Sequence, residues 1–171
     1  VFSAGRSHTN ARGMLPSAQG IFMSWAEVTT PGRYVVVGEL VDPAGSFQAV
    51  FQTSSSGNSP IPPDYTAETR ELDRAVFDYD IVILQAHGNE GNHVPPTEGP
   101  EQTWAKNILS VGGVRHHDDA IDSDDSWGNP DPGRATTGPA GDGRVKPDLC
   151  FFNGASGFRV GITMQPGRGP G

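Results

Sequence analysis

A short segment around the glycine-flanked Asn89 has residue types and a spacing that could form a reactive site. Residues 80–91 have the sequence DIVILQAHGNEG, in which an apolar run ends at Gly88-Asn89-Glu90-Gly91. In open α/β sheets, ligands bind where strands end at their carboxyl side. Glycines let the backbone approach a substrate, and the Asn89 amide can donate a hydrogen bond to a developing oxyanion. An ordinary Gly-Asn turn has the same pattern, so both interpretations stay open.

The elements expected to position this loop form a βαβ unit. Residues 47–51 and 81–86 are predicted strands, because continuous apolar runs are typical of strands covered on both faces. Residues 66–79 carry apolar side chains at helical spacing after the Pro62-Pro63-Asp64 loop, and predict a helix. We therefore expect an α/β fold with a mostly parallel sheet and helices on both faces. Further strands are predicted at residues 21–23, 34–37 and 108–111, and around Cys150.

Composition and charge exclude several classes of protein. The chain has 171 residues, of which 35% are hydrophobic, with 23 glycines and 15 prolines, a mixture that indicates a loop-rich or incomplete domain. Its formal net charge of −8 argues against nucleic acid and anionic membranes as partners, since both require a basic surface. No apolar run approaches the roughly 20 residues of a membrane helix. The single cysteine excludes an internal disulfide. The chain begins with Val1 and not with Met, so we expect residues upstream of it.

Several segments, taken in order, resemble the subtilisin-like serine proteases (subtilases). They are residues 10–18 (NARGMLPSA), 88–91 (GNEG), 105–114 (AKNILSVGGV), 123–128 (SDDSWG) and 143–149 (GRVKPDL). The resemblance covers most of residues 8–152. It implies that residues 1–152 form part of a subtilase-like catalytic domain, and that residues 153–171 are an irregular Gly/Pro-rich tail.

The resemblance also implies a function and a set of site residues. The parent protein would be a secreted or extracytoplasmic serine endopeptidase that acts on polypeptides, with Asn89 completing the oxyanion hole. The specificity pocket would be formed by Ser55, Ser56 and Gly57 on one wall and by Ala86 and Gly88 on the other. A flexible solvated connection is the alternative interpretation of residues 53–59.

The catalytic triad of the family is not found in the chain. A subtilase needs Asp, His and Ser in that order, with the His in a His-Gly-Thr-His motif. His8 lies in a polar stretch without flanking glycines and is interpreted as a surface residue. Thr163 stands where the family has its Ser, but Pro166 and the following Gly/Pro run prevent the helix that would orient the hydroxyl. We therefore expect the chain alone to be inactive.

A non-catalytic pseudoenzyme or peptide-binding domain is the alternative function, because no nucleophile–base pair can be assembled from the sequence. A nucleotide-binding turn at Gly88-Asn89-Glu90-Gly91 is rejected, since the chain lacks a Gly-x-Gly-x-x-Gly motif and a phosphate-loop lysine.

The remaining candidates are interpreted as structural. The acidic segment at residues 116–125, with His116, His117 and several aspartates, could be imagined to hold zinc or calcium. Its spacing matches no metal motif, so we interpret it as a solvated loop and assign no metal or cofactor. Trp104 and Trp127 are interpreted as packing anchors, and Cys150 as a small buried apolar residue.

Overall fold

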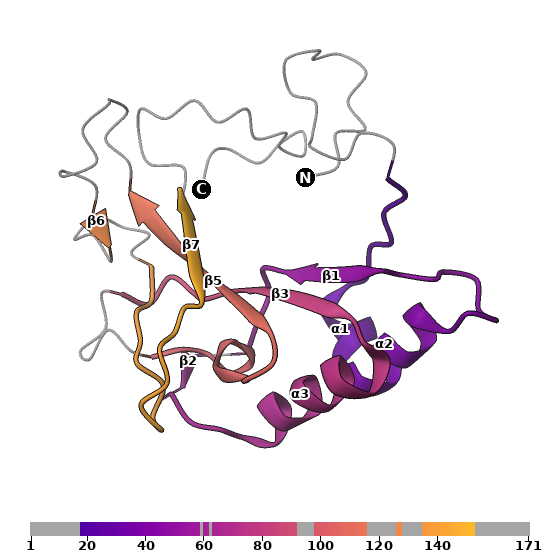
Figure 1. Cartoon of the computed structure of the whole chain (residues 1–171), viewed down its shortest axis with the longest axis horizontal. Coiled ribbons are helices and arrows are strands. Elements are labelled where there is room, and N and C mark those ends of the chain that lie inside the picture. The colour runs from indigo at the N-terminus through magenta and orange to yellow at the C-terminus, as the bar shows by residue number, and fades with distance from the viewer. Residues whose placement is uncertain are drawn as a thin grey trace, which may run out of the picture.

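Figure 1 shows a computed structural model of the chain, which describes residues 18–58, 60–61, 63–91, 98–115, 126–127 and 135–152. Its elements in chain order are α1 (Trp25–Thr29), α2 (Arg33–Val41), β1 (Phe51–Ser54), β2 (Pro60–Ile61), α3 (Ala67–Tyr79), β3 (Val82–Ala86), β4 (Gly99–Pro100), the 3-10 helix η2 (Glu101–Trp104), β5 (Leu109–Arg115), β6 (Ser126–Trp127) and β7 (Leu149–Phe152).

The main sheet is mostly parallel. Its order is β1-β3-β5-β6, and β7 also pairs with β5. β1, β3, β5 and β7 run parallel, whereas β6 is antiparallel to β5. β2 and β4 form a separate antiparallel pair. The α/β class and the parallel sheet expected from the sequence are thus present, and β1, α3 and β3 form the predicted βαβ unit.

Helix α3 begins and ends at well-defined local signals. Thr66 and Thr69 form a reciprocal capping box, in which the Thr66 N–H donates to Thr69 Oγ1 over 2.7 Å. At the other end Asp80 adopts a left-handed conformation with φ 50°, which ends the helix just before β3. The predicted helix at residues 66–79 is therefore confirmed.

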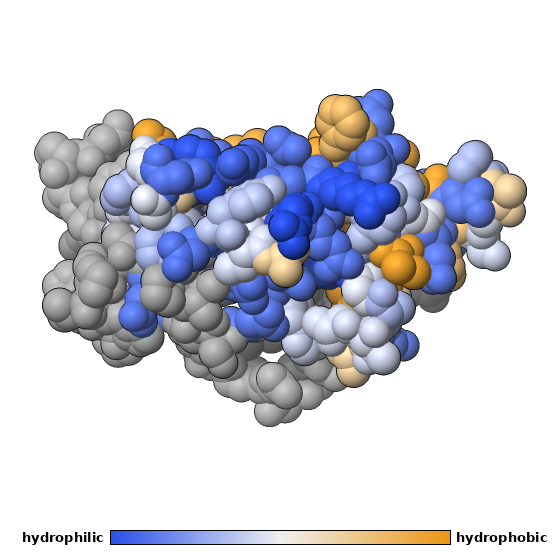
Figure 2. All heavy atoms as spheres, turned by 90° about the horizontal axis from the view of Figure 1, so that it is seen from below, coloured by the Kyte–Doolittle hydropathy of each residue, from blue (hydrophilic) through white to orange (hydrophobic). Residues whose placement is uncertain are grey.

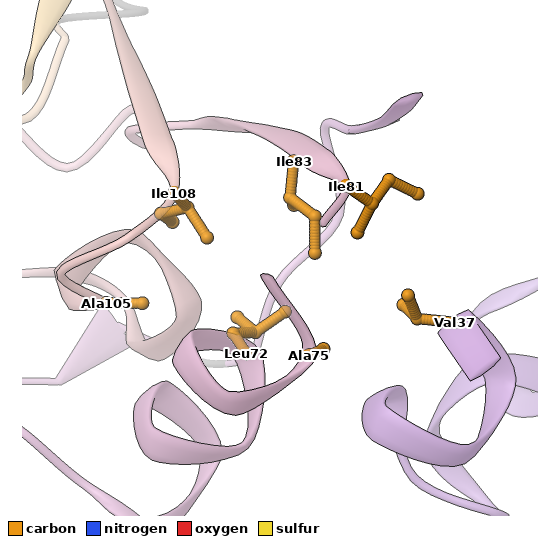
Figure 3. Packing of buried hydrophobic residues seen from close by; sticks show 7 residues of the cluster. All are labelled: Val37, Leu72, Ala75, Ile81, Ile83, Ala105 and Ile108. Carbon is orange, nitrogen blue, oxygen red and sulfur yellow. The ribbon is translucent and has the colours of Figure 1, made fainter. Parts of the chain in front are cut away.

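The core lies between the sheet and the helices on one of its faces. Figure 3 shows Leu72 and Ala75 of α3 facing Ile83 of β3 and its neighbour Ile81, with Val37 of α2 beside them. Ala105 and Ile108 complete the cluster. Helices α2 and α3, with α1 packed on α2, lie on the same side of the sheet (Figure 1). Seen from this helical side, the surface is mostly hydrophilic (Figure 2), so the outer faces of the helices meet water.

The other face of the sheet exposes apolar side chains and is not covered by any helix in the part of the chain that the structure describes. Side chains of all four parallel strands are exposed there: Phe51, Val82, Leu109, Leu149 and Phe151. The expectation of helices on both faces is therefore met on one face of the described sheet.

Three strand predictions are wrong or displaced. Residues 34–37 lie in helix α2, because Arg33, Val36, Val37 and Leu40 form a buried stripe at helical spacing. This packing overrides the preference of consecutive valines for strands. Residues 21–23 have no regular structure, and the strand expected at 47–51 begins only at Phe51. Gln48 interrupts that stretch with a positive φ of 55°.

Several sequence-based expectations fall outside the described residues. They concern His8, the acidic segment 116–125, Thr163 and the tail at residues 153–171. Within the described ranges, no helix is long and apolar enough to cross a membrane.

The core cluster makes a direct stability prediction. Leu72 is fully buried, with 0% exposure, whereas Phe77 on the same helix is 81% exposed. We expect Leu72→Ala to lower the free energy of unfolding by about 2–5 kcal/mol, because it removes buried methyl groups and leaves a cavity. Phe77→Ala is the matched control and should change it by less than about 1 kcal/mol. Urea unfolding of both variants checks the prediction, and equal losses would contradict this core.

Candidate functional site

An open cleft of about 720 Å³ lies where the strands β1 and β3 end, next to β5. This volume is in the range of small-molecule pockets. Its walls come from Ser55–Asn58 after β1, Ala86–Glu90 at the end of β3, and Val111–Gly113 in β5. The candidate residues Ser55, Ser56, Gly57, Ala86, Gly88 and Asn89 all line it. The structure thus brings together every site residue that was predicted from the sequence.

The loop after β3 depends on glycine at position 88. Gly88 has a φ of +114°, a conformation that L side chains rarely adopt. A Cβ atom there would also overlap the Glu90 carboxylate and would lie 2.5 Å from Pro100 Cδ. Backbone bonds on either side hold the loop, since the His87 N–H donates to the Val111 carbonyl and the Thr136 N–H to the Gly88 carbonyl. Glycine is therefore required by the path of the chain.

Glu90 fixes the backbone next to Asn89. Its carboxylate accepts hydrogen bonds from the Asn89 N–H at 2.7 Å and from the Thr136 hydroxyl at 3.0 Å. The Glu90 N–H in turn donates to Thr136 Oγ1 over 3.0 Å. The side chain of Asn89 is exposed, and no hydrogen bond between described residues engages its amide. The loop therefore holds its backbone in place while the Asn89 amide is available to a ligand.

The opposite wall, at Ser55–Gly57, is also held by specific bonds. The Gln85 side-chain amide donates to the Ser56 carbonyl over 3.0 Å, and the Asn58 N–H donates to Gln102 Oε1 over 3.2 Å. A Cβ atom on Gly57 would collide with Pro100. These contacts favour a shaped wall over the flexible connection that was the alternative interpretation.

His87, which the sequence analysis did not single out, forms part of the back wall of the cleft. Its Nδ1 is 2.6 Å from Ser110 Oγ, and the two residues are 1% and 0% exposed. The ring also contacts Trp104 edge to face, with centroids 4.8 Å apart. The pKa of His87 is lowered to about 4, mainly by burial and also by the nearby charge of Lys146, while Asp148 opposes the shift. The imidazole is therefore neutral at pH 7.

The pair of His87 and Ser110 has the spacing of a base and a nucleophile, but not the access. Both side chains are buried, so a substrate in the cleft cannot reach the Ser110 hydroxyl. We interpret the pair as support for the loop that follows His87. Alternation along β3 and its two flanking residues is the sequence signal for this position, because Ile81, Ile83, Gln85 and His87 are buried in turn.

The segment at residues 143–149 has a structural role in the described fold. Lys146 Nζ lies 2.6 Å from Asp148 Oδ2, and the Ser110 N–H donates to the same oxygen over 2.7 Å. Lys146 is buried, so this ion pair depends on its hydrogen bonds to offset desolvation. The pair joins β5 to the chain entering β7.

The other candidates do not add a site within the described ranges. Those residues contain no group of three or more His, Cys, Asp or Glu side chains that could hold a metal ion. Trp104 is fully buried, which confirms it as a packing anchor. Cys150 is a free, half-buried thiol whose pKa is raised by burial. The side chain of Trp127 is not described.

No protein-family model matches the sequence, and no curated protein matches it. The resemblance to subtilases rests on the sequence motifs alone.

The buried imidazole predicts a pH dependence of stability. In the unfolded chain His87 takes up a proton near pH 6.5, whereas in the folded chain it does so only near pH 4. Because the unfolded state binds more protons between these values, stability should fall as pH falls from about 6.5 to about 4, by roughly 3 kcal/mol in total. His87→Gln removes the titrating group, so its stability should change less across this window. Urea unfolding at a series of pH values tests this, and identical pH profiles for the two proteins would contradict it.

Proposed function

We propose that this chain is the part of a subtilisin-like serine endopeptidase that holds the polypeptide substrate and supplies an oxyanion donor. One observation carries the proposal: the residues that the resemblance assigns to the oxyanion hole and the specificity pocket all line one cleft at the ends of β1 and β3. Asn89 is exposed on that cleft, on a loop whose backbone N–H groups are hydrogen-bonded to the side chains of Glu90 and Thr136.

The chemistry assigned to Asn89 follows from this arrangement. When a nucleophile attacks a peptide carbonyl, negative charge develops on the carbonyl oxygen. A preoriented amide donor stabilises that charge without reorganising at the moment of reaction. The Asn89 amide can act in this way, because the loop backbone is held by Glu90 and Thr136. The hydrogen bonds that the Glu90 carboxylate accepts also disperse its negative charge, which would otherwise repel a nearby oxyanion.

A non-catalytic peptide-binding domain is the second candidate. The observation that favours it is the burial of His87 and Ser110, the Ser–His pair within hydrogen-bonding distance among the described residues. Under this proposal the same cleft binds extended polypeptides without cleaving them.

The endopeptidase proposal predicts the kinetics of an Asn89 variant. In the natural gene product that contains this chain, we expect a serine-directed fluorophosphonate probe to label the protein. Asn89→Ala should lower kcat by about 100- to 1,000-fold, because the lost donor acts mainly in the transition state. KM should change little. Hydrolysis of a fluorogenic peptide measures both constants.

The matched control is Asn58→Ala, on the same cleft. The Asn58 side chain already donates to Glu101 Oε2 over 3.0 Å, so its loss should leave kcat within a few fold of the original value. A folded gene product that takes up no probe but binds the peptide would favour the non-catalytic domain. Equal losses of kcat in the two variants would contradict the role of Asn89.

A further inference from the structure

A second cavity, of about 610 Å³, lies along β1 on the side of the helices. Its walls come from residues 18–25, from α2 and from residues 46–56. Much of the lining is apolar, including Val28, Leu40 and Ile81. The cavity shares Trp25, Ser55 and Ser56 with the cleft described above, but its other end lies beneath β1.

Two polar groups that line this cavity have buried atoms without a hydrogen-bond partner in the described part of the chain. Arg33 lines it with 2% exposure, and its Nε and Nη2 atoms make no hydrogen bond. Gln52 also lines it, and its buried Oε1 is likewise unpaired. Gln52 stands in register with the core residue Ile83, which places its side chain on the helical side of the sheet. Since buried polar atoms are almost always hydrogen-bonded, a donor and an acceptor in one cavity indicate a missing partner.

The surrounding charges determine what that partner is. Glu68 and Glu71 are the acidic groups that act on Arg33 through space, but neither forms an ion pair with it. Glu68 accepts a hydrogen bond from Gln102 Nε2, and Glu71 accepts one from the Tyr34 N–H. Two carboxylates near one guanidinium already give the region a net negative charge. A further anion is therefore disfavoured, and a neutral hydrogen-bond acceptor is favoured.

We propose that this cavity binds a neutral carboxamide with an apolar substituent. The amide oxygen accepts from the Arg33 guanidinium, and the amide N–H donates to Gln52 Oε1. The apolar substituent lies against Val28, Leu40 and Ile81, where its burial supplies the hydrophobic part of the affinity. The amide is either that of a small molecule or the peptide unit of a short apolar peptide. The proposal does not depend on protease activity.

The experiment is a titration of the isotope-labelled chain, followed by NMR, with hexanamide and N-acetyl-leucinamide as the two sources of the amide. Hexanol and hexanoate are the comparison ligands. We expect saturable binding of at least one amide, with chemical-shift changes at Val28, Arg33 and Leu40. Hexanol should bind at least about tenfold more weakly, because a hydroxyl oxygen is a weaker acceptor than an amide oxygen and carries its donor and its acceptor on one atom. Hexanoate should also bind more weakly, because Glu68 and Glu71 act on the same guanidinium through space and disfavour a further negative charge.

Variants locate the site. Arg33→Met keeps a long side chain but removes the donors, and should weaken amide binding by at least about tenfold. Arg70→Met is the matched control on an exposed position of α3 and should leave the affinity unchanged. Gln52→Leu removes the acceptor and should also weaken amide binding. It is the test variant if Arg33→Met does not fold.

Three results would overturn the proposal. The first is the absence of saturable binding by both amides, and the second is equal affinity for hexanamide and hexanol. The third is an unchanged affinity in Arg33→Met or Gln52→Leu. Any of these would mean that water alone satisfies Arg33 and Gln52. Shift changes confined to Ser55–Gly57 would likewise reject the cavity, because they would place the ligand in the neighbouring cleft.

Discussion

The packing of α3 on β3 and on the start of β5 is the constraint on which the described structure depends. Leu72 and Ala75 of the helix lie against Ile81 and Ile83 and share one core with Ile108. This contact fixes β3 between β1 and β5, in parallel register. Parallel strands that are held side by side end at the same edge of the sheet, so their following loops converge. The cleft between residues 55–58 and 86–90 is the consequence of that convergence.

Buried polar groups lie both behind the cleft and beneath β1. Behind the cleft, His87 is bonded to Ser110, and Asp148 is bonded to both Lys146 and the Ser110 backbone. These hydrogen bonds hold the strands and the glycine loop, although His87 Nε2 is itself buried without a partner among the described residues. They leave the Asn89 side chain to act on a ligand. Beneath β1, Arg33 is buried and Gln52 has a buried Oε1 atom, and neither group has a partner in the ranges that the structure describes. Unpaired buried groups reduce stability, and they are reasonable candidates for binding because a ligand can satisfy them.

Sequence patterns predicted the parts of the fold in which local preference and packing agree. The helix at 66–79 has a capping box and an apolar stripe, and the strands near 81–86 and 108–111 are continuous apolar runs, so each was found. Residues 34–37 were predicted as a strand because consecutive valines favour one, yet packing on α3 and the sheet makes them helical. Because of that error the burial of Arg33 was not predicted, since it follows from the helical spacing of Arg33, Val36, Val37 and Leu40. The position of Asn89 at the end of a strand could be predicted from the sequence, whereas residues 55–57, 86 and 88 were assigned from the resemblance to subtilases. The role of His87 required knowing which face of β3 is buried.

The central claim is that the ends of β1 and β3 form a polypeptide-binding cleft. The most direct measurement is a titration of the isotope-labelled chain with a blocked, extended tetrapeptide, followed by the backbone and side-chain amide signals in NMR spectra. The account predicts saturable shifts at Ser55–Gly57 and Ala86–Gly88 and in the Asn89 side-chain amide. Signals on the outer face of α3, such as that of Phe77, should not move. Saturable shifts elsewhere, or none at the Asn89 amide, would contradict it.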